Sequence, residues 1–413
     1  MRKKSILMFV LIASILFSSV LFAQDVTVKF MNFSSSDANA KYLEEMKNIF
    51  EEENPGIKIE VETIGFGDYF TKLMTVIAGG NPPDAFELNY ENFYTYAKKG
   101  VLMDLGNLMK NTNFDSSVIN EMALNAFKAD NKQFGLPFSF SNVLLIYNKD
   151  LFDKAGVEYP NSDWTWVEEQ AAAEKIRALG RNTFGIFHPV HFWEFYKVVR
   201  QNGGNLFNKD RTAFTVNSSQ NIETLQFMVD RILKTNVMPN DAQLAGMGDW
   251  DLFVSGRIGM IVTGTWAFPT FTSDAEFEWD VEIEPGMKDK ATHFFSNGLV
   301  LSKKAKNTEA AFKWIEFLSS NKKVAKIRID AAWELPAVTY EDILADYVSQ
   351  TPPNNKEAVF ESLDYLVTPP VIEQFAEMAD IMNRYLEAAR YGDMTPKEAL
   401  DKAQEELSSK INL

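Results

Sequence analysis

The histidines are the first residues that could support chemistry in this chain of 413 residues. His188 and His191 have a spacing that can hold a metal ion, but no third ligand candidate clusters near them, and His293 is distant in sequence. A protein metal site normally needs at least three ligands. The absence of cysteine also excludes thiolate ligands and disulfides. We therefore interpret the pair as polar contacts in an aromatic-rich loop, and expect no metal and no cofactor.

Catalytic signatures are missing from the sequence. It contains no G-x-S-x-G, H-E-x-x-H, G-x-x-x-x-G-K-[ST] or G-x-G-x-x-G motif. A pair of carboxylates for glycoside hydrolysis is an open alternative among the 57 acidic residues, but none stands in an aromatic frame that would tune it as an acid. We expect a protein that is not an enzyme, with a secreted carbohydrate-active enzyme as the alternative.

Aromatic and short polar side chains occur together in four segments. A sugar has apolar C–H faces ringed by hydroxyls, so its site needs flat rings beside amide, hydroxyl or carboxylate groups. Each ring could equally be a core residue. No arginine occurs in these segments, which favours a neutral solute over an anion. The candidates are Asn89, Tyr90, Glu91 and Asn92; His191 and Trp193; Thr265 and Trp266; and Trp333 and Glu334.

Residues 253–266 are predicted to position one of these rings. Gly256 is expected to cap a helix, and the apolar run from Ile258 to Val262 to form a buried strand. Gly264 then breaks the strand just before Trp266. Ligands of α/β proteins lie at the carboxyl ends of strands, so Trp266 is predicted to form a wall of a ligand cleft.

The N-terminal part alternates between the two kinds of element. Strand and helix patterns follow one another at 26–30, 37–53, 57–61, 68–78 and 85–86. This alternation predicts a parallel, doubly wound α/β sheet. The loops at 32–36, 65–68 and 87–91 would lie at the carboxyl ends of its strands. They add Ser34, Ser35 and Asp68 to the candidate ligand contacts.

The length without a leader, about 390 residues, suggests two domains. A second series of strands and helices begins after Pro137, and the strand at 294–301 could cross back to the first lobe. We expect lobe 1 to contain residues 24–137 and 294–335, and lobe 2 to contain residues 138–293 and 336–413. Asn297 on the returning strand is a further candidate ligand contact.

Residues 1–23 read as a signal peptide. Arg2, Lys3 and Lys4 precede an apolar core that ends at Ala23, the expected cleavage point. The alternative is a membrane anchor, but the core is short and no stop-transfer cluster follows it. Without a cysteine the protein is not a lipoprotein. We expect a soluble protein of the periplasm.

The charge balance is acidic. The formal net charge of −16 becomes about −19 when the three cations of the leader are removed. A surface of this charge repels nucleic acid and anionic lipid headgroups. No nucleic-acid partner is therefore expected.

Several short motifs follow one another in a characteristic order. They include Gly80-Asn-Pro-Pro-Asp84, Leu145-Ile-Tyr-Asn-Lys-Asp-Leu-Phe152, Phe253-x-x-Gly-Arg-x-x-Met260 with Gly264-x-Trp266, Ala310-Ala-Phe-Lys-Trp-Ile-Glu-Phe-Leu318, and Thr395-Pro-x-x-Ala-Leu400. With these motifs the chain resembles the extracellular solute-binding proteins of bacterial ABC importers, in the sugar-binding group that includes the maltose-binding proteins. The resemblance extends over nearly all of the chain after the leader.

The resemblance implies a type II periplasmic binding protein fold. Two α/β lobes, each a doubly wound sheet flanked by helices, would be joined by hinge crossings and close over a solute. The closed form, expected to be monomeric, would dock on permease subunits driven by a separate ATPase. Mapped onto this sequence, the sugar-stacking tryptophan of the family falls on Trp266, and its polar contacts fall around Asn89 to Asn92.

Further contacts implied by the resemblance fall on Ser141 or Asn142, and on His191 with Trp193. Maltose-type proteins have an acid and a tyrosine at this last pair, and a charged pair where this chain has residues 32–36. A maltodextrin ligand therefore does not follow. The expected ligand is a neutral mono- or oligosaccharide, and the alternative is a non-sugar solute such as a polyamine or a glycerol-phosphate ester.

Overall fold

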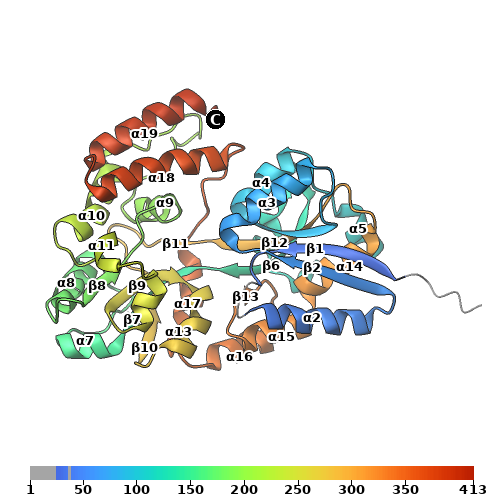
Figure 1. The fold of residues 1–413 in the computed structure, drawn as a ribbon, viewed down its shortest axis with the longest axis horizontal. Helices are drawn as coiled ribbons and strands as arrows, with labels where there is room; N and C mark the ends of the chain where they lie inside the picture. The colour runs from blue at the N-terminus through green and yellow to red at the C-terminus, as the bar shows by residue number, and fades with distance from the viewer. Residues whose placement is uncertain (1–24, 36–38) are drawn as a thin grey trace, which may run out of the picture.

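Two β-sheets form the centres of two lobes in the computed structural model, which describes residues 25–35 and 39–413 (Figure 1). The expected leader at 1–23 and the expected helix start at Asp37 lie outside these residues. The first lobe holds a six-stranded sheet in the order β13-β6-β12-β3-β1-β2. The second holds a four-stranded sheet in the order β10-β7-β9-β8.

The strands of the first sheet are β1 (Val26–Asn32), β2 (Ile57–Thr63), β3 (Ala85–Asn89), β6 (Gly135–Ser141), β12 (Phe295–Leu301) and β13 (Leu335–Pro336). Those of the second are β7 (Val143–Asn148), β8 (Phe184–Phe187), β9 (Ile258–Gly264) and β10 (Trp279–Glu282). Two small pairs join β4 (Lys128–Ala129) to β5 (Lys132–Gln133), and β11 (Thr292–His293) to β14 (Leu366–Val367).

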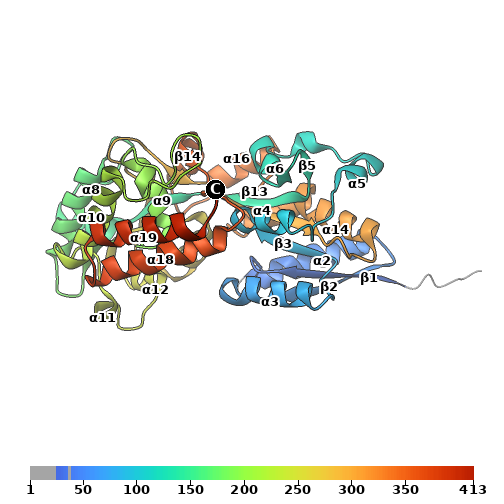
Figure 2. The same cartoon turned by 90° about the horizontal axis from the view of Figure 1, so that it is seen from above.

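Both sheets are mixed. In the first, β1 runs parallel to β2 and β3, whereas β12 is antiparallel to β3 and β6. In the second, β8 is parallel to β9, and β7 lies antiparallel between β9 and β10. The carboxyl ends of β1 and β2 point toward the second lobe (Figures 1 and 2). The loops that follow these two strands are therefore placed at the junction between the lobes.

Helices cover both faces of the first sheet because its strands alternate two buried sets of side chains. Phe30 packs with the core under α2 (Ala40–Glu53) and α14 (Thr308–Ser320), and its neighbour Met31 packs with the core under α3 (Phe66–Ala78) and α4 (Tyr90–Lys98). Beside them lie α5 (Gly106–Asn111), α6 (Glu121–Ala126) and α15 (Lys322–Asp330). The sheet is thus buried on both sides.

The second sheet is also covered twice. One core includes α12 (Asp249–Val254) and α13 (Phe268–Asp274), and the other α7 (Lys149–Ala155) and α8 (Trp166–Arg177). A further layer consists of α9 (Phe192–Gln201), α10 (Ser219–Leu233), α18 (Phe375–Tyr391) and α19 (Pro396–Lys410), with α18 and α19 side by side (Figure 1). The short α11 (Asp241–Leu244) precedes α12.

The passages between the sheets differ in part from the expected boundaries. β6 pairs with β12 as far as Ser141, because Phe140 and Ser141 continue the strand alternation beyond Pro137. Only Asn142 separates β6 from β7. After β13 the chain enters α16 (Glu341–Ser349), which packs on α15 and whose Ile343 and Tyr347 lie in a core shared with the second sheet, before α17 (Glu357–Glu361) reaches β10. The return at 294 lies between β11 and β12.

The lobes also touch away from these passages. α4 of the first lobe packs against α18 of the second, and Thr95 Oγ1 donates a hydrogen bond to the carbonyl of Glu373 at 3.1 Å. Within residues 25–35 and 39–413, no helix combines the length and the apolar character needed to cross a bilayer.

Candidate functional site

A buried carboxylate organises the carboxyl edge of the first sheet. Glu87 occupies the middle of β3, and its Oε2 accepts hydrogen bonds from the backbone N–H groups of Phe33 and Ser34, each at 3.1 Å. Ser35 N–H donates to Asn32 Oδ1 at 3.2 Å. The loop after β1 is thereby folded onto β3. Burial raises the pKa of Glu87 to about 7, because the charged form loses its hydration.

A second carboxylate on this side is paired with a buried cation. Arg328 of α15 donates to Glu334 Oε2 at 3.1 Å, and its guanidinium lies 4.3 Å from the ring centroid of Phe138 and 4.1 Å from that of Trp333. Ser139 Oγ donates to the same carboxylate at 2.7 Å, and Asn297 Nδ2 approaches it at 3.4 Å. Burial lowers the pKa of Arg328 to about 10.

Several polar atoms of these residues can still form a hydrogen bond. We call the set Asn32, Ser34, Ser35, Glu87, Ser139, Asn297, Arg328 and Glu334 the first-lobe polar cluster. Within the described part of the chain, Ser34 Oγ, Ser35 Oγ, Glu87 Oε1 and Arg328 Nε and Nη1 are buried and have no hydrogen-bond partner. Buried polar atoms of native proteins are normally paired, so this concentration of unpaired donors and acceptors is suited to a polar ligand.

Aromatic rings line the passage between the two sheets. Thr265 N–H donates to the carbonyl of Asn142 at 3.2 Å, which places Trp266 beside the point where β6 becomes β7. The indole folds back over Gly264, where a Cβ atom would lie 2.1 Å from the ring. A side chain at position 264 would displace the ring, and this explains the glycine in the Gly-x-Trp sequence. Phe295 lies 5.6 Å from Trp266 between ring centroids.

The segment after β3 closes the site from the side of α4. Asn89 lies opposite Asn297 in the pairing of β3 with β12, and it accepts a hydrogen bond from Asn92 Nδ2 at 2.9 Å. The Tyr90 ring packs 5.7 Å from Phe294. Glu91 is buried, and this burial raises its pKa to about 8. The group 89–92 therefore lies at the junction between the lobes.

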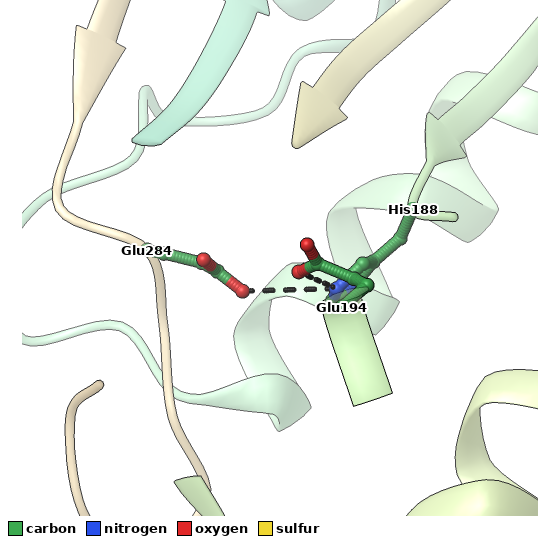
Figure 3. A group of neighbouring side chains, drawn as sticks. All are labelled: His188, Glu194 and Glu284. Atoms are coloured by element: carbon green, nitrogen blue, oxygen red, sulfur yellow. Dashed lines mark hydrogen bonds and ion pairs between the residues drawn. The ribbon is translucent and has the colours of Figure 1, made fainter. Parts of the chain in front are cut away.

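A group of buried charges in the second lobe has the composition of a metal site (Figure 3). His188 Nε2 lies 2.9 Å from Glu194 Oε1 and 3.7 Å from Glu284 Oε1. Glu194 lies only six residues after His188, whereas Glu284 is distant in sequence. His293 also joins them, with Nε2 at 3.0 Å from Glu194 Oε2. The ammonium of Lys197, however, is paired with both Glu194 and Glu284.

The tautomer of His188 argues further against a metal. Arg231 Nη1 lies 3.1 Å from His188 Nδ1, and a guanidinium can only donate. Nδ1 must accept, so Nε2 carries the proton and donates it to Glu194. A protonated nitrogen is no metal ligand, and Lys197 already supplies the positive charge. We call His188, Glu194, Lys197, Glu284, His293, Arg231 and Glu169 the second-lobe charge network.

Many of the candidates from the sequence meet at the junction. Ser34, Ser35, Asn297 and Glu334 belong to the first-lobe polar cluster, Asn89, Tyr90, Glu91 and Asn92 adjoin it, and Ser141, Asn142, Thr265 and Trp266 lie at the passage between the sheets. Asn142 serves the passage itself, since its Nδ2 donates to the carbonyl of Val359 at 2.7 Å. The Thr265 hydroxyl is buried and has no partner among the described residues.

Other candidates have a different environment. Trp333 is 2% exposed in the first-lobe core, where it covers Arg328, so it offers no free face to a ligand. Asp68 is exposed in the first turn of α3. His191 is exposed at the start of α9, and Trp193 packs 5.2 Å from Phe375 of α18.

Two charged members of the site were not singled out from the sequence: Arg328 was missed, and Glu87 was expected only within a loop at 87–91, whereas it lies in β3. Glu87 had a visible signal, because it interrupts the otherwise apolar start of β3, Ala-Phe-Glu-Leu-Asn. Arg328 had none. It reaches Glu334 and the β3 side of the sheet only through the packing of α15, which no local pattern reveals.

The chain belongs to the bacterial extracellular solute-binding proteins, because residues 33–325 match the model of that family. An ABC substrate-binding protein from Listeria monocytogenes, solved in complex with cycloalternan, is 49% identical to it. That similarity covers 94% of this chain and 99% of the Listeria chain, with a TM-score of 0.90.

Two more distant similarities agree with this family. The arabinooligosaccharide-binding protein of Bacillus subtilis is 24% identical over 392 residues, which are 89% of this chain and 88% of that protein. The cyclic alpha-maltosyl-1,6-maltose binding protein of Arthrobacter globiformis shares the fold, at 22% identity and a TM-score of 0.74 over 93% of this chain and 98% of that one. The type II periplasmic binding protein fold and the family expected from the sequence are confirmed.

Proposed function

We propose that this protein is the carbohydrate-capturing component of an ABC importer and that it binds a neutral gluco-oligosaccharide between its lobes. The proposal rests on one observation: the first lobe has buried polar atoms without hydrogen-bond partners among the described residues, and the junction has the Trp266 and Phe295 rings. Flat rings suit the C–H face of a sugar, and hydroxyl, amide and carboxylate groups suit its hydroxyls.

The charges of the site support a neutral ligand. Arg328 is neutralised by Glu334, and burial keeps Glu87 and Glu91 prone to protonation. An anionic solute would meet the carboxyl groups of Glu87, Glu91 and Glu334, while the guanidinium of Arg328 is already paired with Glu334. A polyamine would have to compete with Arg328 for Glu334. A ligand with many hydroxyls and no charge avoids both costs.

The similarity to the Listeria protein supplies a first ligand to test, the cycloalternan with which that protein was solved. In the mechanism we propose, a ligand that contacts both lobes stabilises the closed form by its differential affinity, and membrane permease subunits recognise that form. No covalent step is involved. A cleaved leader would deliver the monomer to the extracellular side of the inner membrane.

A thermal-shift and calorimetry screen tests the function. We expect cycloalternan or a linear gluco-oligosaccharide to raise the unfolding temperature, because ligand binding stabilises the native state by mass action. Arabinooligosaccharides, spermidine and glycerophosphocholine serve as the competing classes. A shift with spermidine or glycerophosphocholine and none with any sugar would overturn the carbohydrate assignment.

A further inference from the structure

Phe66 is an exposed aromatic residue at the start of α3. It is 52% exposed, although its ring lies beside Phe33 and Phe70, which pack in the core under α3 and α4. Its ring centroid lies 5.3 Å from that of Phe33 and 5.6 Å from that of Phe70. The interplanar angles are 70° and 89°, so neither neighbour stacks flat on Phe66. With 52% of the side chain exposed, part of the ring is available to a further partner.

The ring borders the first-lobe polar cluster. β2 is parallel to β1 with Thr63 opposite Asn32, so the residues after both strands emerge at the same edge of the sheet. Phe33, which Phe66 touches, directly precedes Ser34 and shares with it the carboxylate of Glu87. Figures 1 and 2 show this edge turned toward the second lobe.

This position combines the two elements of sugar recognition a second time. The exposed ring of Phe66 lies against Phe33, and the next two residues along the chain, Ser34 and Ser35, have hydroxyls with no partner within the described residues, as does Glu87 Oε1. Trp266 provides the corresponding ring beside the passage to the second lobe. Phe66 follows β2 of the first sheet, and Trp266 follows β9 of the second. An oligosaccharide that bridges the two lobes can place one unit against each ring.

We propose that Phe66 is a second aromatic platform, which stacks on one pyranose unit of an oligosaccharide while another unit lies against Trp266. The inference rests on the proposed function and adds to it the minimum size of the ligand. Phe66 then determines preference for chain length, because a monosaccharide bound at Trp266 does not reach it. The occupant is a neutral sugar ring and not a protein partner, since the ring adjoins unpaired hydroxyl and carboxylate atoms.

The test compares substitutions at Phe66 by calorimetry with cycloalternan, maltotetraose and glucose. We expect Phe66→Ala to weaken binding of the tetrasaccharide that the wild type binds by about tenfold, the size of one lost aromatic stacking contact. Phe66→Trp should retain this affinity. Phe66→Leu, which keeps apolar volume but loses the flat ring, should fall between the two. Glucose affinity should be the same in all four proteins.

Met122→Ala is the matched control, because Met122 is also 52% exposed and lies in the first lobe on α6. Its tetrasaccharide affinity should equal that of the wild type. Unchanged affinity in Phe66→Ala, or an equal loss in Met122→Ala, would overturn the platform while leaving the proposed function intact. An equal loss for glucose and tetrasaccharide would overturn its role in length preference. A wild type that binds no sugar would overturn the proposed function and the platform together.

Discussion

The first-lobe polar cluster and the second-lobe charge network are both buried, but their carboxylates have opposite electrostatic environments. Burial alone would raise the pKa of Glu194, yet Lys197 and His293 hold it well below its ordinary value. Among the described residues no cation forms an ion pair with Glu87, and burial raises its pKa to about 7. In the second lobe, the buried carboxylates of Glu194 and Glu284 are neutralised by the buried cation of Lys197. In the first lobe, Glu87 is not neutralised in this way.

The hydrogen-bond partners show the same contrast. Lys197, Glu194, Glu284 and Arg231 are each paired with an opposite charge in the second-lobe charge network. In the first-lobe polar cluster, two serine hydroxyls, one carboxylate oxygen and two guanidinium nitrogens have no partner among the described residues. The second-lobe charge network also leaves Glu169 Oε1 and His293 Nδ1 without a partner among the described residues, but Lys197 and Arg231 are each paired there with a carboxylate. Its charges stabilise one another within the fold, whereas the unpaired atoms of the first-lobe polar cluster can bind a ligand.

The largest effect is expected when the buried cation of the second-lobe charge network is removed. Lys197→Met leaves Glu194 and Glu284 buried without their cation and should lower the free energy of unfolding by about 3–5 kcal/mol. Urea denaturation measures this loss. Lys326→Met, which removes an exposed lysine paired with Asp330, is the control and should unfold like the wild type. A loss below about 1 kcal/mol would contradict the contrast drawn between the two regions.

The next effect is a pH dependence of the unfolding free energy that comes from Glu87 in the first-lobe polar cluster. The pKa of Glu87 is raised from its ordinary 4.5 to about 7 in the folded protein, so its stabilising contribution is complete below pH 4.5 and is lost as the pH rises to 7. Glu87→Gln should remove a decrease of about 3 kcal/mol from the profile of unfolding free energy between pH 4.5 and pH 8.

Exposed Glu60 of β2 provides the comparison for that profile. Glu60→Gln should keep the slope of the wild type. Glu91, whose pKa is raised in the same direction, is present in all three proteins, so its contribution cancels in the difference. Identical slopes in the wild type and Glu87→Gln would show that Glu87 is ionised throughout this range.

A smaller change is expected at the ring beside the passage. Trp266→Ala should weaken sugar binding by about 1–3 kcal/mol, the range of a lost aromatic anchor. Calorimetry with the sugar found in the screen measures it. Tyr159→Ala, at an exposed ring of the second lobe, should bind like the wild type. Unchanged affinity in Trp266→Ala would exclude this ring from the site.

The smallest effect is expected at Asp68. Its carboxylate is exposed in the first turn of α3, close in sequence to the first-lobe polar cluster but outside its hydrogen bonds. Asp68→Asn should change sugar affinity by less than about twofold, because an exposed polar group gains little from a ligand that competes with water. A tenfold loss in a titration would place Asp68 among the direct contacts and extend the site beyond the buried cluster.

Local patterns predicted much of the fold. The alternation at 26–30 and 57–61 gave the parallel β1 and β2, and the Gly-x-Trp sequence placed Trp266 after β9. Pro137 was a poor marker of the first passage, since β6 continues through it to Ser141. Proline lacks an N–H group, yet a strand tolerates it where that donor is not needed.

The electrostatic core of each lobe could not be predicted in this way. Arg328 meets Glu334 over a span of a few residues, but only folding places that pair behind β3 near Glu87. His188 and His293 share Glu194 although they lie far apart in sequence. The sequence could not show whether Trp333 contacts a ligand or the core. Its ring stacks on the buried guanidinium of Arg328, and this contact uses the face that a sugar would need.

Asn142 has a mechanical consequence. It alone connects β6 to β7, and its amide nitrogen is held by Val359 and Ser362. One residue contributes only two soft backbone dihedrals. Movement of one sheet relative to the other at this strand is therefore confined to torsion over a very short length of chain, and the return strand at 294 must twist with it. An extra glycine beside Asn142 would add two backbone dihedrals to this connection and make it more flexible.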